Sequence, residues 1–251
     1  MDIKDLFKIV ARLRAECPWD RKQTTKTISH LYVEEAYELA EALDSGDPCR
    51  IEEELGDLLY VVLMGIRIAT DEGMTDFGKV SERAAEKLIR RHPHVFGDKV
   101  VEDEGKVLAN WEKIKEKEKQ GKGFFEGIPK TLPALSRAQM MQERAARVGF
   151  DWPSTHGPLE KVREETEELT EHIGGDKDEL EHELGDLLFA VVNLARHTDV
   201  RAEQALARSN RKFARRFEQV RRLAKERGLD LEEMDIEGLD KLWDEVKESE
   251  E

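Results

Sequence analysis

The chain has 251 residues and a formal net charge of −15, with 39% apolar and 39% charged residues but only 6% aromatic residues and seven prolines. This length suits one large domain or two ordinary ones, and the composition favours helices over sheets. The acidic balance argues against a nucleic-acid or anionic-membrane partner, because both need a basic footprint, but a local cluster of cations still allows a phosphate ligand.

Cysteine content and hydropathy indicate the cellular compartment. Cys17 and Cys49 are too few for a disulfide scaffold and suit a reducing environment. The N-terminus lacks the apolar core of a signal peptide, and the longest apolar run, 58–66, is about half the length that spans a bilayer. The sequence therefore predicts a soluble, cytoplasmic protein.

Apolar residues recur at spacings of three and four through nearly the whole chain, which is typical of amphipathic helices. Pro18 ends the first helix, and the turn DSGDP ends the second with Gly and Pro where a helix C-terminus favours them. In the first half we expect helices at about 6–13, 24–43, 49–70, 77–91 and 102–119.

A change of composition predicts a domain boundary. The segment 120–133, QGKGFFEGIPKTLP, contains three glycines and two prolines, so we divide the chain into domains 1–120 and 121–251. After this segment the order of parts repeats, and we expect helices at about 138–148, 159–173, 177–196 and 202–227.

The second half repeats the motifs of the first. EELGDLLYVV at 53–62 returns as HELGDLLFAV at 182–191. Corresponding acids lie 129 or 130 residues apart and corresponding cations 125 apart, differences that loop lengths produce. The pairs are Glu35 with Glu165, Glu38 with Glu168, Glu54 with Glu183, Asp57 with Asp186, and Lys87, Arg90 and Arg91 with Lys212, Arg215 and Arg216. The sequence therefore predicts an all-α fold made of tandem duplicated helical-bundle domains.

The repeated acids suggest a cation site. Glu35 and Glu38 leave one face of a helix at spacing i, i+3, and Glu54 and Asp57 do the same on the next helix. The short turn makes the two helices antiparallel neighbours, so the acidic edges face each other. Converging carboxylates repel unless protons or a cation neutralise them, and an all-oxygen cage selects a hard ion such as Mg²⁺ or Mn²⁺.

The alternative is that the acids belong to a solvated helix face. Two features oppose it: the helix beyond Leu58 is apolar nearly all round, which predicts burial, and Gly56 and Gly185 stand in mid-helix at roughly 1 kcal/mol each relative to Ala. A close helix approach or a crowded ion site would account for these glycines. We therefore predict a metal site in each half.

The basic clusters suggest a phosphate ligand. Lys87, Arg90 and Arg91 fall within five residues, and the same pattern returns in the second half. A metal beside such cations suits a polyphosphate, whereas a single cluster of this kind is usually a solvated face. Trp19 and Trp152 also recur after the opening helix of each half, as core anchors or as walls of a base pocket.

The motifs CPWDRKQTTKTISHLYVEEAYELAEAL and EEELGDLLYVV in the first half, and VGFDWP, KVREETEEL, HELGDLLFAVVNLAR and NRKFARRF in the second, resemble the MazG family of nucleoside triphosphate pyrophosphohydrolases. The resemblance covers essentially the whole chain. It implies the all-α fold shared with dimeric dUTPases and phosphoribosyl-ATP pyrophosphohydrolases, and Mg²⁺-dependent hydrolysis of NTPs and dNTPs to the monophosphate and pyrophosphate.

The family signature EExxE…ExxD assigns roles to particular residues. It implies the metal ligands Glu35, Glu38, Glu54 and Asp57, and then Glu165, Glu168, Glu183 and Asp186. The resemblance also suggests phosphate contacts from Lys161, Lys212 and Arg216, with Asn210 nearby, beside the other candidate substrate-binding residues Lys87, Arg90, Arg91, Trp152 and Arg215.

We expect direct attack of water at a phosphorus of the α–β bridge. Glu34 and Glu164 adjoin the ligand positions and are candidate catalytic residues that orient the water. No GK[ST] phosphate loop and no evident Ser–His–Asp or Cys–His arrangement suggests other chemistry. The apolar runs 58–66 and 187–195 exceed what one hairpin buries, which predicts a homodimer.

Two alternatives remain. A di-iron carboxylate bundle needs two Glu-x-x-His motifs, and ELEH at 179–182 supplies one, but its counterpart position in the first half is Glu53. A non-catalytic helical interaction or regulatory module is the other, with the charged tail WDEVKESEE either as a docking segment or simply solvated.

Overall fold

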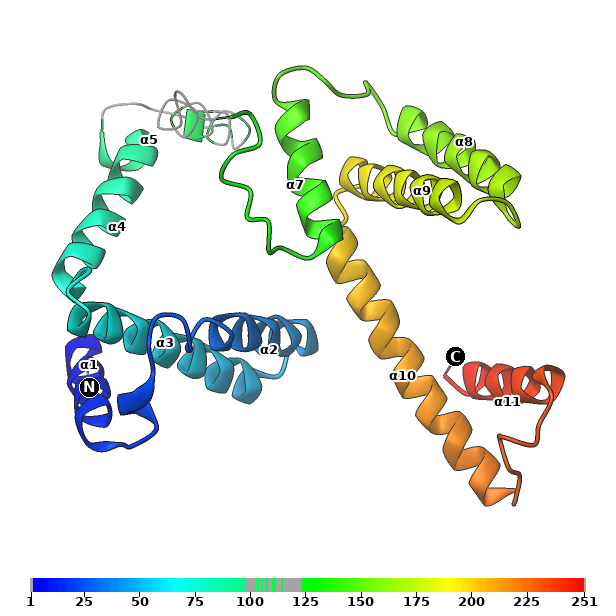
Figure 1. Ribbon diagram of the computed structural model, residues 1–251, viewed down its shortest axis with the longest axis horizontal. Helices are drawn as coiled ribbons and strands as arrows, with labels where there is room; N and C mark the ends of the chain where they lie inside the picture. Colours follow the sequence, from blue (N-terminus) through cyan, green and yellow to red (C-terminus); the bar gives the residue numbers. More distant parts are fainter. Residues whose placement is uncertain are drawn as a thin grey trace. The chain divides into compact units, whose positions relative to one another are not determined.

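The computed structural model describes residues 2–97 and 123–250, together with positions 103, 105, 107, 110, 111 and 114. This part of the chain is helical and contains no strand, which confirms the predicted fold class (Figure 1). The chain forms two compact units, Met1–Gly121 and Lys122–Glu251. Within the described ranges no helix is long and apolar enough to cross a membrane. The predicted helix 102–119 lies almost wholly outside the described residues.

Unit 1 is built around one long helix. Its elements are α1 (Ile3–Glu16), the 3₁₀ turn η1 (Asp20–Lys22), α2 (Leu31–Ser45), α3 (Pro48–Asp71), α4 (Phe77–Arg91) and α5 (Pro93–Phe96). The helix α3 contacts α1, α2 and α4, and its residues Val61, Met64 and Ile68 form the core with Val10 and Ile28. The core therefore lies on one side of α3.

Local signals fix the hairpin of α2 and α3, which lie side by side in Figure 1. Gly46 ends α2 in the left-handed conformation at φ 69°, where a side chain would be strained. Asp47 then caps α3 by accepting a hydrogen bond from the backbone N–H of Cys49, and Pro48 occupies the first turn. These neighbouring caps bring the two helices together as an antiparallel pair.

The prediction of a helix at 24–43 is wrong in its first part, because α2 begins at Leu31. The threonines compete for the backbone: the N–H of Thr24 donates to Oγ1 of Thr27, and the N–H of Thr27 donates to Oγ1 of Thr24. Ile28 follows in this turn and is buried in the core. The segment before α2 is thus a capped turn anchored by one apolar side chain.

Unit 2 comprises α7 (Ala134–Ala146), α8 (His156–His172), α9 (Lys177–His197), α10 (Ala202–Glu226) and α11 (Ile236–Glu248). The helix α9 contacts α7, α8 and α10 and occupies the place in this unit that α3 has in the first. It pairs most extensively with α8. Asp176 caps α9 by accepting hydrogen bonds from the N–H groups of Asp178 and Glu179.

The end of the chain differs from its prediction as a solvated tail. Residues 236–248 form α11, which packs against α10. Leu242 and Val246 are buried with Val220 and Ala224, and Trp243 packs against this cluster. The apolar spacing of three and four within the acidic stretch is what forms the contact.

One face of α3 and one face of α9 remain exposed, although the sequence predicts burial all round. Leu55, Leu59 and Val62 are 51%, 37% and 40% exposed. Their counterparts, each 129 residues further on, are Leu184, Leu188 and Val191 at 46%, 48% and 44%. The same apolar face is therefore uncovered within each unit.

Candidate active site

The first acidic cluster lies at the hairpin of unit 1. Glu35 and Glu38 project from α2 and Glu54 from α3, and one ligand atom of each lies within 4.8 Å of the others. The buried Oε2 of Glu54 has no hydrogen-bond partner among the residues that the structure describes. An unpartnered buried carboxylate oxygen in an all-oxygen group suits a hard cation.

Electrostatics in this cluster favour protons or a cation. Burial, and then the charges of Glu38, Asp57 and Glu54, raise the pKa of Glu35. Burial and the charges of Glu38, Glu53 and Asp57 likewise raise the pKa of Glu54. Asp57 is thus close enough to act on both carboxylates, although it is not in the compact group of three. The site holds repelling charges that a cation would relieve.

The expected explanation of the mid-helix glycines is wrong within each unit. A Cβ atom at Gly56 or at Gly185 would meet none of the described heavy atoms within 4 Å. The close approach occurs at Gly65 instead, where a Cβ would lie 1.6 Å from the hydroxyl oxygen of Tyr32. Gly65 therefore lets α2 and α3 pack tightly.

In unit 2 the acids form two groups, and the first is on α8. Glu164, Glu165 and Glu168 have ligand atoms within 4.8 Å of one another, and Glu165 is buried at 4% exposure. Nζ of Lys161 lies 2.7 Å from Oε1 of Glu164 and 2.5 Å from Oε1 of Glu165. These two bonds raise the pKa of Lys161, so its ammonium group stays charged beside the carboxylates.

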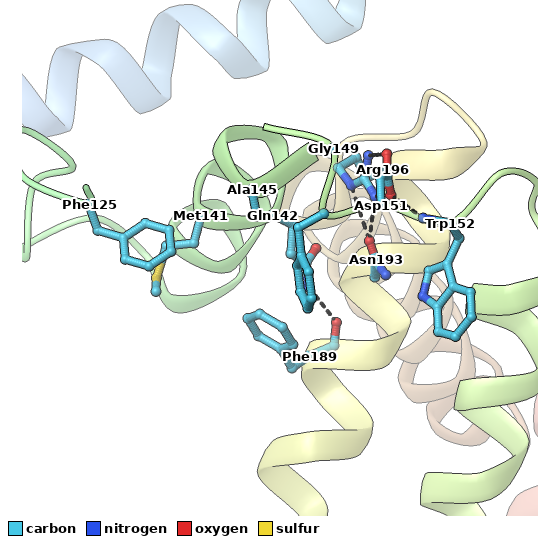
Figure 2. Close-up of a pocket in the computed structure, with 11 residues that line it drawn as sticks. Phe125, Met141, Gln142, Ala145, Gly149, Asp151, Trp152, Phe189, Asn193 and Arg196 are labelled. Atoms are coloured by element: carbon cyan, nitrogen blue, oxygen red, sulfur yellow. Dashed lines mark hydrogen bonds and ion pairs between the residues drawn. The ribbon is translucent and has the colours of Figure 1, made fainter. Parts of the chain in front are cut away.

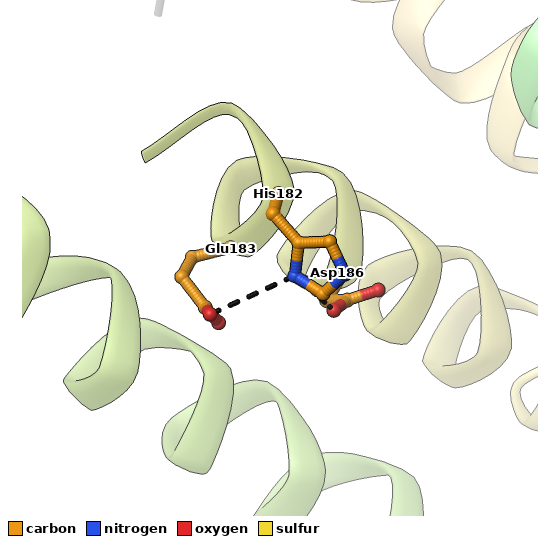
Figure 3. A group of neighbouring side chains, drawn as sticks. All are labelled: His182, Glu183 and Asp186. Atoms are coloured by element: carbon orange, nitrogen blue, oxygen red, sulfur yellow. Dashed lines mark ion pairs between the residues drawn. The ribbon is translucent and has the colours of Figure 1, made fainter. Parts of the chain in front are cut away.

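The second group of unit 2 is on α9 and comprises His182, Glu183 and Asp186 (Figure 3). Nδ1 of His182 lies 3.2 Å from Oδ2 of Asp186 and 3.7 Å from Oε1 of Glu183. Burial, Glu165 and, more weakly, Glu183 raise the pKa of Glu168. The charge of Glu183 on α9 therefore reaches the α8 group, and the two groups face each other across the helix pair.

The predicted phosphate-binding residues of unit 2 lie on α10. Asn210, Lys212, Arg215 and Arg216 are within two turns of one another. Glu250 pairs with two of them: Nε of Arg216 lies 2.7 Å from Oε2, and Nη2 of Arg215 lies 3.2 Å from Oε1. The carboxylate of Glu250 occupies the place that a phosphate would take on Arg216.

In unit 1 the corresponding cations lie on α4, in its last turns. This helix contacts α3 and α5. The guanidinium carbon of Arg91 is 5.5 Å from the centre of the Trp111 ring, a cation–π contact. The acids that the sequence singles out in unit 1 thus converge, whereas Lys87, Arg90 and Arg91 have their recorded neighbours elsewhere.

A pocket of about 530 Å³ lies in unit 2 between α7, the loop 149–152 and α9 (Figure 2). Trp152, which the sequence marks as a core anchor or pocket wall, lines it and is 49% exposed. A Cβ at Gly157 would lie 2.5 Å from the Trp152 ring, so the glycine makes room for the indole. Sequence reasoning missed the polar wall, Gln142, Asn193 and Arg196; its one signal is an asparagine within the apolar run of α9.

Two helical units, each with a carboxylate cluster at its helix hairpin, define an all-α protein with duplicated, oxygen-rich cation sites. The chain matches the MazG nucleotide pyrophosphohydrolase domain over residues 23–96 and again over 154–221. It is 43% identical to a nucleoside triphosphate pyrophosphohydrolase of Escherichia coli, over 99% of this chain and 98% of that protein.

It is also 44% identical to the nucleoside triphosphate pyrophosphohydrolase/pyrophosphatase MazG of Thermotoga maritima, over 97% of this chain and 95% of that protein. A Bacillus subtilis protein, YabN, is 46% identical over 96% of this chain and 51% of its own length. The chain belongs to the MazG family, which confirms the resemblance inferred from its motifs.

Proposed function

We propose that this protein hydrolyses nucleoside triphosphates, both NTPs and dNTPs, to the nucleoside monophosphate and pyrophosphate. The observation that carries the proposal is the pair of carboxylate clusters in a chain of the MazG family. The names of the E. coli and T. maritima relatives support this reaction. They favour an enzyme over a non-catalytic helical module.

Mg²⁺, with Mn²⁺ as a substitute, is the proposed cofactor. The donors are carboxylate oxygens, and the buried Oε2 of Glu54 has no partner among the described side chains. The proposed ligands are Glu35, Glu38, Glu54 and Asp57 in unit 1, and Glu165, Glu168, Glu183 and Asp186 in unit 2. When bound, the ion supplies charge stabilisation for the phosphate oxygens.

The chain's own groups position the nucleophile and the phosphates. Water attacks a phosphorus of the α–β bridge, the new P–O bond forms as the bond to the leaving pyrophosphate breaks, and the water proton passes to a base. Glu164 is the proposed water-orienting residue, and Lys161, 2.7 Å from it, fixes its carboxylate. Glu34 has the same place before Glu35 in unit 1.

The triphosphate is proposed to bind the basic faces of α10 and α4. Arg216 and Arg215 already hold a carboxylate, that of Glu250, which supports anion binding at this place. The full set of proposed contacts is Lys161, Asn210, Lys212, Arg215 and Arg216 in unit 2, and Lys87, Arg90 and Arg91 in unit 1.

A homodimer is the proposed assembly. The exposed face Leu55, Leu59 and Val62 of α3, and its counterpart on α9, are apolar surfaces of the kind that a second copy covers. Gel filtration at a monomer mass would overturn this assembly. The domain limits 1–120 and 121–251 and the cytoplasmic location stay predictions.

The test of function is pyrophosphate release from a panel of NTPs and dNTPs with and without Mg²⁺, using the wild type, Glu54→Ala and Glu183→Ala. Activity that needs Mg²⁺ and falls only in Glu183→Ala assigns the reaction to unit 2. A partial loss in both variants assigns it to both units. No release from any nucleotide rejects the proposed function.

A further inference from the structure

The pocket of unit 2 has the chemistry of a site for a flat aromatic ring. Phe125, Phe150, Trp152 and Phe189 line it, and these rings are 43%, 82%, 49% and 46% exposed. Exposed aromatic side chains around one cavity provide faces on which a planar ring stacks. At about 530 Å³ the cavity has room for such a ring.

Gln142 gives this cavity an unused hydrogen-bond acceptor. It is 7% exposed, and its Nε2 donates to the backbone carbonyl of Phe189 at 2.8 Å. That bond fixes which end of the amide is the oxygen. The buried Oε1 has no hydrogen-bond partner among the described residues. An unsatisfied buried acceptor of this kind usually costs stability, and a ligand donor would remove the cost.

Asn193 gives the same cavity a donor. Its Oδ1 accepts hydrogen bonds from Nε and Nη2 of Arg196, at 3.1 and 2.8 Å, so its NH₂ end points away from the guanidinium (Figure 2). Arg196 is itself held by Asp151, whose Oδ2 accepts from Nη1 at 2.9 Å. The orientations of Gln142 and Asn193 are therefore set by other contacts before any ligand enters.

The pocket continues the face of α9 that carries the acids. Asn193 follows Asp186 by seven residues, which places both on one side of the helix, about 10 Å apart along its axis. A nucleotide separates its base edge from its phosphates by a comparable span. A triphosphate held at the acids therefore directs its base along α9 into the pocket.

We infer that this pocket binds the nucleobase of the substrate, and that Oε1 of Gln142 accepts a hydrogen bond from a donor on the edge of the base. The inference rests on the proposed function and adds to it the base-binding residues. In adenine the donor is the exocyclic amino group, and an adjacent ring nitrogen faces the NH₂ group of Asn193. Phe150, the most exposed ring, moves aside to uncover Gln142.

The duplicated unit lacks this polar wall. The positions 129 residues before Phe189 and Asn193 are Tyr60 and Met64. Met64 is fully buried in the core of unit 1 and has no amide to offer, and the Tyr60 hydroxyl donates to Oδ1 of Asp20 at 2.9 Å. The inference therefore concerns unit 2.

The test compares ATP with purine riboside triphosphate, which lacks the exocyclic amino group. In the wild type we expect the KM to rise about 5- to 10-fold on its removal, as for one lost neutral hydrogen bond, with little change in kcat. In Gln142→Met the KM for ATP rises by a similar factor, and the two nucleotides become equivalent. Equal KM values in the wild type overturn the inference by themselves, even if the variant fails to fold.

Gln139 offers a matched control on the same helix. It is also buried, but its Nε2 donates to the carbonyl of Val200 at 3.2 Å and its Oε1 accepts from the N–H of Ala202 at 3.0 Å. Gln139→Met loses stability yet keeps the preference for ATP. A preference that persists undiminished in Gln142→Met overturns the inference.

Failure of the proposed function is a separate outcome. If no nucleotide releases pyrophosphate, titration calorimetry with ATP and with purine riboside triphosphate still measures base recognition. A difference in affinity that is lost in Gln142→Met supports the pocket, and equal affinities reject it.

Discussion

Lys161 and Glu165 form an ion pair one turn apart on α8, with Nζ 2.5 Å from Oε1, and the carboxylate side chain is 6% exposed while the lysine is 40% exposed. The lysine therefore neutralises a buried charge at the place proposed for a cation. Removing the lysine leaves the carboxylate to be compensated by protons or by a metal.

Lys161→Met is expected to lower the free energy of unfolding in EDTA by about 1–2 kcal/mol, because a buried charge loses its partner while the lysine itself is partly solvated. Mg²⁺ restores part of this loss. Urea unfolding with and without Mg²⁺ measures both effects. Lys8→Met is the control, since Lys8 pairs with Asp5 on an exposed surface and its loss costs little. Equal losses in the two variants would contradict the special role of Lys161.

Glu54→Gln should raise the thermal stability of the metal-free protein at pH 7. Burial and neighbouring carboxylates raise the pKa of Glu54 in the folded state. Its ionisation therefore opposes folding: the stability is highest below the unfolded pKa and falls as the pH rises through the folded pKa. The neutral amide removes this repulsion.

The same substitution should reduce the response to Mg²⁺. At a hundredfold excess over its dissociation constant, a bound ion stabilises the folded state by about 2.7 kcal/mol, or roughly 5–10 °C. Differential scanning calorimetry with and without Mg²⁺ compares Glu54→Gln with Glu53→Gln, whose acid is not in the group of three. An undiminished Mg²⁺ shift in Glu54→Gln would remove Glu54 from the proposed ligands.

Local sequence signals predict much of this fold. Asp76 caps α4, and the helix spans the predicted range 77–91. The convergence of Glu35, Glu38 and Glu54 follows from their spacing and from the two-residue turn that joins α2 to α3. These features depend on neighbours in the sequence, so periodicity and capping residues suffice.

Features that depend on distant contacts are not predictable in this way. The free Oε1 of Gln142 exists because Nε2 bonds the carbonyl of Phe189, 47 residues away. The helix α11 forms in an acidic stretch because Leu242 and Val246 find Val220 on α10. Periodicity predicts that a face is apolar, but not which surface covers it.

Glu250→Gln is expected to lower the KM for nucleoside triphosphates by about two- to fivefold, with an unchanged kcat, because the substrate no longer competes with a carboxylate for Arg216. Pairing with Arg216 lowers the pKa of Glu250, so this carboxylate is ionised at neutral pH. Steady-state kinetics with ATP and Mg²⁺ measure the effect. Glu248→Gln, at the exposed end of α11, serves as the control. The proposed anion contact fails if Glu250→Gln leaves the KM unchanged.

Asp151 predicts a loss of stability in acid. Hydrogen bonds from Arg196, and then from His197 and the N–H of Trp152, lower the pKa of Asp151 to about 2. A carboxylate with a lowered folded pKa stabilises the protein above its unfolded pKa, near 3.9, and this contribution disappears as the pH falls to about 2. In unit 2 the contribution is about 2 kcal/mol.

Asp151→Asn should therefore lower the stability at pH 6 by about this amount and flatten its decline between pH 4 and pH 2. Urea unfolding followed across this pH range measures the slope. Because Arg196 then loses its anchor, the amide of Asn193 is released as well, and the KM for ATP rises together with the loss of stability. A variant with wild-type acid sensitivity would show that the Asp151–Arg196 pair does not form in solution, and the fixed orientation of Asn193 would then need another cause.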